Sequence, residues 1–155
     1  MLGKIDNQLY VMLNETKASR AYLVQYHNGG KGLNKQSFLK MSTTNEQVQL
    51  GVKPCMPELK DQFRSVLAYF TREININGFC YIPNILAIKD DDASMFEFMK
   101  SRGVVAQFGY SIKDYNNTVI AFVCLEYLDT PKVDVSLINN CFEKHIEVFQ
   151  TLLNK

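Results

Sequence analysis

The chain has 155 residues, with 17 Lys and Arg against 16 Asp and Glu, and its formal net charge is +1. Apolar residues make up 46% and charged residues 21%, which excludes general disorder and predicts a buried core. The balanced charge argues against a duplex nucleic-acid binder and against a protein that binds acidic membranes. We therefore expect one globular domain over residues 1–155.

The first half of the chain alternates between helical and strand patterns. Ile5, Leu9 and Leu13 recur at helical spacing, and β-forming residues follow. A glycine-rich break then separates two strand patterns, as in a hairpin. The elements expected are a helix over 4–16, strands over 20–26 and 37–42, a loop over 43–57, and a helix from 57 or 58 to about 73.

The second half contains the clearest strands and the most amphipathic helix. Aspartates or serines precede two apolar helical patterns and are expected to cap them, and Gly103 is expected to end the first. The elements expected are a strand over 79–82, a short helix from about 93 to 102, strands over 104–112 and 118–127, and a helix over 134–153. The two tight strand pairs predict an α+β fold with an antiparallel sheet rather than a βαβ wrap.

Three strings resemble the GAF domains, which are relatives of PAS domains. Arg20 to Gly30 ends in Tyr26-His27-Asn28-Gly29, and an aromatic-His-Asn-Gly segment ends the first strand in one GAF-like group. The segments Gly103–Ser111 and Thr118–Tyr127 resemble the fourth and fifth strands. The resemblance implies a five- or six-stranded antiparallel sheet, with the terminal helices on one face and middle helices or loops over a ligand pocket on the other.

The resemblance also implies a function, although the chain departs from the best-defined subfamilies. The Asn-Lys, Phe, Asp-Glu set of cyclic-nucleotide-binding members is incomplete, because Asn34, Lys35 and Phe38 lack the following Asp-Glu. No Cys has a His neighbour of the kind that bilin-binding members use, and the cysteines are not clustered as in free-methionine-sulfoxide reductases. The ligand expected is a small polar or nucleotide-like molecule, and the cofactor stays unknown.

Polar and aromatic residues of the predicted sheet are the expected ligand contacts. His27 and Asn28 end a strand beside a glycine loop, and Glu126 interrupts an apolar strand. The predicted ligand-binding residues are Tyr26, His27, Asn28, Lys40, Phe79, Tyr81, Arg102, Phe108 and Glu126. The alternatives are that His27 and Asn28 satisfy loop backbone, that the aromatic residues build the core, and that Glu126 pairs with Lys40 or Arg20.

Other motifs favour structural roles. The glycines of 29–32 do not match a phosphate loop, and Asp90–Asp92 lacks the spacing of a calcium loop, so a hairpin turn and a helix cap are expected. A catalytic pair would require Cys80 to reach His27, and two histidines are too few for most His-rich metal sites. We predict no catalytic residue and no metal ligand.

The sequence thus favours a non-catalytic sensor domain without deciding whether the protein is an enzyme. We expect a homodimer through the helices 4–16 and 134–153. The alternatives are an interaction module whose pocket is filled by its own side chains, and a small thiol enzyme.

Cysteine usage and apolar windows predict the compartment. The four cysteines form no CxxC motif, and Cys124 and Cys141 fit core patterns. With no sign of secretion and no window of about 18 apolar residues, a cytoplasmic location without a membrane span in this chain is expected. A membrane anchor outside this chain remains open.

Overall fold

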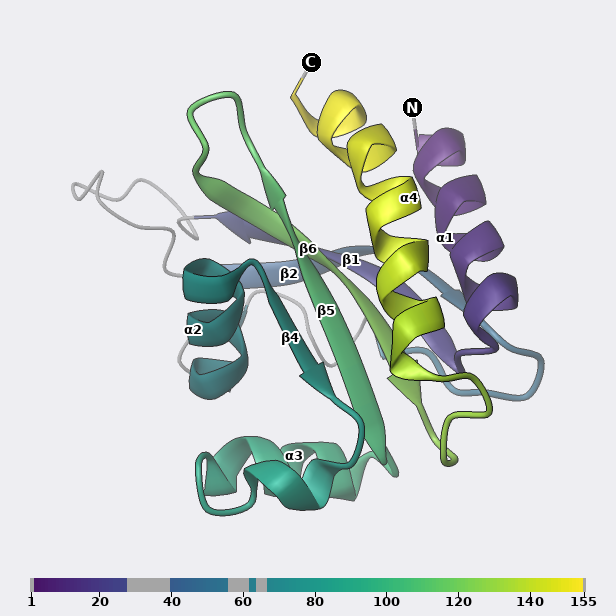
Figure 1. Cartoon of the computed structure of the whole chain (residues 1–155), viewed down its shortest axis with the longest axis vertical. Helices are drawn as coiled ribbons and strands as arrows, with labels where there is room; N and C mark the ends of the chain where they lie inside the picture. Colours follow the sequence, from purple (N-terminus) through teal and green to yellow (C-terminus); the bar gives the residue numbers. More distant parts are fainter. Residues whose placement is uncertain (1, 28–39, 56–61, 64–66, 155) are drawn as a thin grey trace.

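A six-stranded antiparallel sheet lies at the centre of the molecule, with helices on both faces (Figure 1). The computed structural model describes residues 2–27, 40–55, 62–63 and 67–154. In chain order the elements are α1 (Leu2–Thr16), β1 (Arg20–His27), β2 (Lys40–Val48), β3 (Gln62–Phe63), α2 (Ala68–Asn77), β4 (Phe79–Ile82), the 3-10 helix η2 (Ile85–Ile88), α3 (Ala93–Ser101), β5 (Ala106–Lys113), β6 (Val119–Tyr127) and α4 (Val135–Leu153). The strand order is β3-β2-β1-β6-β5-β4, which confirms the predicted fold class.

Each face of the sheet is buried beneath its own helices. The terminal helices α1 and α4 lie side by side on one face, and α2 and α3 lie on the other (Figure 1). Side chains alternate along a strand, so Val123 and Leu125 of β6 point into the core beneath α1 and α4. Phe122 and Cys124 point into the core beneath α2 and α3. The two ends of the chain lie at the same end of the molecule (Figure 1).

Aspartate caps fix the starts of three helices. Asp134 Oδ1 accepts a hydrogen bond from Leu137 N at 2.9 Å and caps α4, as expected for an aspartate before this helix. Asp92 Oδ1 accepts from Met95 N at 3.0 Å and caps α3 in the same way. Its second oxygen, Oδ2, accepts from Tyr69 N at 3.1 Å, in the first turn of α2. One carboxylate therefore satisfies backbone donors of two helices, and α2 has no side-chain cap of its own.

Two predicted elements had wrong boundaries. Residues 43–48 continue β2 instead of forming a loop, because their backbone pairs with β1 and the polar side chains of Thr43 and Asn45 are buried. The helix expected from residue 57 or 58 to about 73 begins at Ala68 and ends at Asn77, and residues 62–63 form β3. The glycine loop at 29–32 lies outside the described residues.

Gly109 on β5 lets α2 approach the sheet closely. A Cβ atom at this position would lie 2.8 Å from Phe70 Cε2 and 2.9 Å from Ile74 Cδ1, both side chains of α2. These distances are shorter than side-chain packing allows, so α2 requires glycine beneath it.

Among the described helices, none has the length and apolarity needed to cross a membrane.

Candidate functional site

A buried carboxylate lies on the sheet face that α2 and α3 cover. Glu126 is 0% exposed, and Arg20 lies directly opposite it on β1. Opposed residues of neighbouring strands point to the same face, so the two side chains meet across the sheet. Tyr22 lies two residues further along β1 and also faces this carboxylate.

Four donors converge on Glu126. Arg20 Nη1 donates to Oε1, and Tyr22 donates its hydroxyl to Oε2 at 2.8 Å. Arg102 makes a two-pronged contact, with Nη2 at 3.0 Å from Oε1 and Nη1 at 3.2 Å from Oε2. We call these four residues, Arg20, Tyr22, Arg102 and Glu126, the Glu126 cluster. Each oxygen of the carboxylate already accepts two hydrogen bonds, so a ligand that bound Glu126 would have to displace a donor.

The charges in the Glu126 cluster determine its protonation. Burial has the largest single effect on Arg102 and opposes its charged form, but the charge and hydrogen bonds of Glu126, together with the nearby Tyr22 and Cys55, outweigh it and raise the pKa of Arg102. Burial, reinforced by Glu126, raises the pKa of Tyr22 and of the nearby Cys55 and Cys124 thiols. At neutral pH the Tyr22 phenol is therefore neutral and Arg102 keeps its positive charge.

The Glu126 cluster joins segments that are distant in the chain. Arg102 is the C-cap residue of α3, and its guanidinium carbon lies 5.1 Å from the centre of the Phe98 ring. Arg20 begins β1 just after α1, and its Nε donates to the carbonyl of Lys53 at 2.7 Å. The cluster thus ties the end of α3 to the junction between α1 and β1 and to the segment after β2.

Three of the predicted ligand contacts lie at the opposite end of β1. His27 pairs with Lys40 in the β1–β2 register, and His27 Nε2 lies 2.9 Å from Ser42 Oγ. The Tyr26 ring packs edge-on against Phe122, with ring centres 6.0 Å apart. Seven residues of extended strand separate His27 from Arg20, which is roughly 23 Å. Lys40 is therefore remote from Glu126, and Arg20 is the predicted partner that pairs with it.

The predicted aromatic contacts are placed differently. Phe108 and Tyr81 pack in the core under α1 and α4, on the other face from Glu126. Tyr81 donates its hydroxyl to Asn139 of α4 at 2.7 Å, and its ring stacks on Phe142. Phe79 is exposed and contacts the Tyr81 ring. The structure therefore does not bring these three residues together with Arg102 and Glu126, and Asn28 lies outside the described residues.

A hollow of about 460 Å³ lies against η2 and α3. Its lining combines apolar side chains, among them Phe96 and Val105, with the cations Lys89 and Lys100 and the acidic side chain of Glu97. Both ammonium groups approach the Phe96 ring, at 5.8 Å and 5.9 Å from its centre. An apolar surface flanked by two cations suits a small anionic molecule with a planar part. Sequence reasoning missed this hollow, because the lysines are eleven residues apart and belong to different elements.

The cysteines are buried and show no catalytic arrangement among the described residues. All four are free and buried, as expected for Cys124 and Cys141. Cys80 is on β4 and His27 is on β1, with two strands between them. Burial raises the pKa of Cys80 to about 12, so its thiol is protonated at neutral pH. The geometry therefore does not support a Cys80–His27 catalytic pair.

The amino-acid sequence matches no protein-family model and no curated protein. Solved structures match nearly the whole chain. The phycoerythrobilin-bound GAF domain from a cyanobacterial phytochrome has a TM-score of 0.75 at 8% identity, with 98% of this chain and 84% of that chain covered. The chromophore-binding domain of a Stigmatella aurantiaca phytochrome has a TM-score of 0.68 at 14% identity, covering 100% and 55%. The chromophore-binding domain of an R. palustris bacteriophytochrome has a TM-score of 0.70 at 15% identity, with 94% of this chain and 53% of that chain covered. These similarities establish that the chain has the GAF-like fold predicted from its sequence.

Proposed function

We propose that this GAF-like domain is a non-catalytic sensor that binds a small polar or nucleotide-like molecule and passes a change to its terminal helices. The observation that carries the proposal is the Glu126 cluster. It connects the C-cap of α3, through Arg102, to Arg20 at the start of β1, directly after α1. Tyr127, the residue after Glu126 on β6, donates its hydroxyl to the carbonyl of Thr16 in the last turn of α1 at 2.8 Å. A displacement of α3 would therefore act on β6 and β1 through buried charged contacts, and on α1 through the Tyr127 hydrogen bond.

Two places are proposed for the ligand. Tyr26, His27 and Lys40 remain the proposed anchors at the end of β1, as the sequence suggested. The hollow beside α3 offers Lys89 and Lys100 to an anionic group. A ligand in this hollow would contact α3 directly, whereas one at the end of β1 would contact the sheet first.

Chemical-shift mapping of the ¹⁵N-labelled chain tests both places. The probes are AMP, cyclic AMP and cyclic GMP at millimolar concentration. Binding beside α3 should shift amides of η2 and α3 and weaken at least about tenfold when Lys89 and Lys100 are both changed to Gln. Binding at the end of β1 should instead respond to Lys40→Gln. Lys4→Gln, on the exposed side of α1, is the control.

Transmission is tested in the same spectra. In the wild-type protein, ligand-induced shifts should extend to α1. Arg102→Met should retain binding but confine the shifts to the ligand's surroundings, because it removes the contact between α3 and Glu126. Absence of shifts with all three probes would count against a nucleotide-like ligand, and shifts that still reach α1 in Arg102→Met would count against this route.

The proposed function includes a homodimer formed through the outer sides of α1 and α4. Phe149 and Leu152, on the apolar side of α4, are buried in the core of the single chain. Tyr10, Val11 and Val148 are instead exposed on these helices and provide an apolar surface. Light scattering should give twice the mass of 17.8 kDa, and Val148→Glu should restore the single-chain mass. A wild-type monomer would contradict the dimer.

The second candidate function is an interaction module with a filled pocket. The close seating of Phe70 and Ile74 on Gly109 favours it, because no space remains there between α2 and the sheet. This candidate predicts dimerisation without shifts from any small-molecule probe.

A further inference from the structure

Three metal-binding side chains converge where α1 and α4 touch. Cys141 and His145 are one helical turn apart on α4, and Glu15 is in the last turn of α1. Residues four positions apart lie on the same side of a helix, so α4 presents sulfur and imidazole together. One ligand atom from each residue can be chosen so that all three lie within 4.8 Å of one another.

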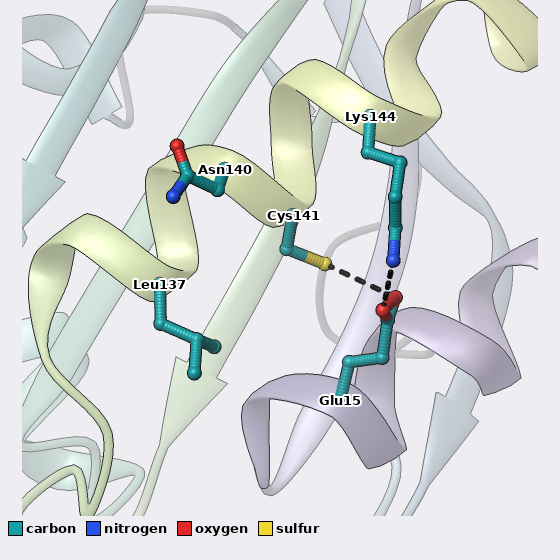
Figure 2. A pocket seen from close by; sticks show the side chains of 5 residues that line it. All are labelled: Glu15, Leu137, Asn140, Cys141 and Lys144. Atoms are coloured by element: carbon teal, nitrogen blue, oxygen red, sulfur yellow. Dashed lines mark hydrogen bonds and ion pairs between the residues drawn. The ribbon is translucent and has the colours of Figure 1, made fainter.

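The contacts among these residues are centred on the Glu15 carboxylate. Its Oε1 lies 2.5 Å from His145 Nε2 and 3.8 Å from Cys141 Sγ. Its Oε2 accepts a hydrogen bond from Lys144 Nζ at 2.5 Å (Figure 2). Lys144 thereby holds one carboxylate oxygen and turns the other toward the sulfur and the imidazole.

Solvent reaches this cluster through a hollow of about 270 Å³. The hollow is lined by Glu15, Leu137, Asn140, Cys141 and Lys144 (Figure 2). A metal ion bound by the three side chains would therefore have space beside it for a water molecule as a fourth ligand.

We propose that Glu15, Cys141 and His145 bind a zinc ion between α1 and α4. A thiolate, an imidazole nitrogen and a carboxylate oxygen are the donors that Zn²⁺ uses in proteins, whereas Mg²⁺ and Ca²⁺ prefer oxygen donors alone. The proposal is independent of the sensor function and departs from the sequence analysis, which predicted no metal ligand.

Two of the three separations between the ligand atoms need only a small adjustment to hold zinc. Tetrahedral coordination, with Zn–S of about 2.3 Å and Zn–N and Zn–O of about 2.0 Å, places ligand atoms about 3.3–3.5 Å apart. The Nε2–Oε1 separation must therefore widen by about 0.8 Å and the Sγ–Oε1 separation shorten by about 0.3 Å. The Glu15 side chain is 31% exposed, so it can make this movement without disturbing the core.

The proton balance and the outer contacts are consistent with the site. On binding, the Zn–S bond replaces the S–H bond of Cys141 and the proton goes to the solvent; a proton carried by His145 Nε2 leaves in the same way. The Gln8 amide contacts His145 Nδ1 from α1. Rotation of this amide would offer its oxygen to an Nδ1–H group, which is the usual support for a metal-bound histidine.

Zinc and cobalt titrations of the full chain, stripped with EDTA, test the site. Calorimetry should give one Zn²⁺ per chain. Co²⁺ should produce the near-ultraviolet charge-transfer absorption of a cobalt–thiolate bond, which reports Cys141 directly. The sequence has two histidines, so ¹⁵N spectra of the imidazoles should show Zn²⁺ shifting the His145 Nε2 signal and leaving His27 unchanged.

Variants identify the ligands. Glu15→Gln and Cys141→Ser should each lower the affinity for Zn²⁺ at least about tenfold. Cys141→Ser should also remove the cobalt–thiolate absorption. Cys80→Ser and Glu143→Gln, the second on the exposed side of α4, should keep both signals. Circular dichroism verifies folding, and the partly exposed Glu15 provides a variant that does not open the core. The assignment is overturned if the wild type binds no stoichiometric zinc, or if either folded ligand variant retains wild-type affinity.

Discussion

Replacing Glu126 by Gln should strongly destabilise the domain. Arg20 and Arg102 have side chains only 5% and 6% exposed, and the carboxylate between them is 0% exposed. The variant would leave two buried guanidinium ions facing a neutral amide, with one acceptor oxygen in place of two. Removing one partner of a buried ion pair costs about 3–5 kcal/mol, and we expect a loss of this size. This is a large part of the stability of a typical domain, which is about 5–15 kcal/mol.

Urea unfolding at pH 7, followed by circular dichroism, measures this loss as a change in the free energy of unfolding. Arg102→Met should cost less than Glu126→Gln, because Arg20 and Tyr22 still compensate the carboxylate. Glu147→Gln, exposed on α4, is the control and should change stability by less than about 0.5 kcal/mol. A loss below about 1 kcal/mol for Glu126→Gln, or a larger loss for Arg102→Met, would refute the reasoning.

Three further predictions concern packing, capping and alkaline pH. Asp92→Ala should lower the free energy of unfolding by about 1–3 kcal/mol, because α2 and α3 both lose a cap. Protection of the Tyr69 and Met95 amides from hydrogen exchange should fall together, and a fall at only one of them would contradict the shared cap. Gly109→Ala should cost about 1–3 kcal/mol in the same urea assay, whereas Gly3→Ala, with nothing within 4 Å, should cost nothing; equal effects would show that α2 can move aside. Burial raises the pKa of Tyr127 to about 12, above its unfolded value of 10.0, so its contribution to stability is complete below pH 10 and is lost as the pH rises through 12; Tyr127→Phe should make the fall between pH 10 and 12 shallower, and an unchanged fall would assign it to other groups.

Strong apolar periodicity made the helices and central strands predictable. The apolar residues at helical spacing in α4 and the continuous apolar run in β6 predict a helix and a strand without information from the rest of the chain. The extension of β2 was missed because Thr43, Asn45 and their neighbours are polar, and only pairing with β1 makes them a strand. The start of α2 was placed too early because the helical spacing of apolar residues includes Phe63. Residues 62–63 instead pair with β2 as a strand.

The two-residue period of a strand shows which side chains share a face, but not which face is which. Phe108 and Tyr81 were therefore assigned to the ligand side, although the helices that cover them are α1 and α4. Pairing of Glu126 with Lys40 or Arg20 was the alternative to a ligand contact, because a buried carboxylate needs a cation, and the structure shows the pair with Arg20. Tyr22 was missed, yet its position two residues after Arg20 was the available signal.

Contacts between distant helices could not be predicted in the same way. Cys141 and His145 are recognisable as a pair from their spacing on α4. Glu15 enters only because the last turn of α1 lies beside Cys141 and His145; both helices were expected on one face of the sheet, but no sequence pattern gives the alignment of one helix along the other. The hollow beside α3 likewise depends on how η2 and α3 meet.

The position of β1 between β2 and β6 has a consequence for the protein during its synthesis. The hairpin of β1 and β2 is complete early, but the inner edge of β1 has no partner until Val119–Tyr127 has left the ribosome. The core under the terminal helices spans Ile5 to Leu152, so α1 has no complete surface to pack on until the chain is nearly finished. The nascent chain therefore carries an open strand edge and an uncovered apolar helix through most of translation, and chaperone protection would matter most during this period.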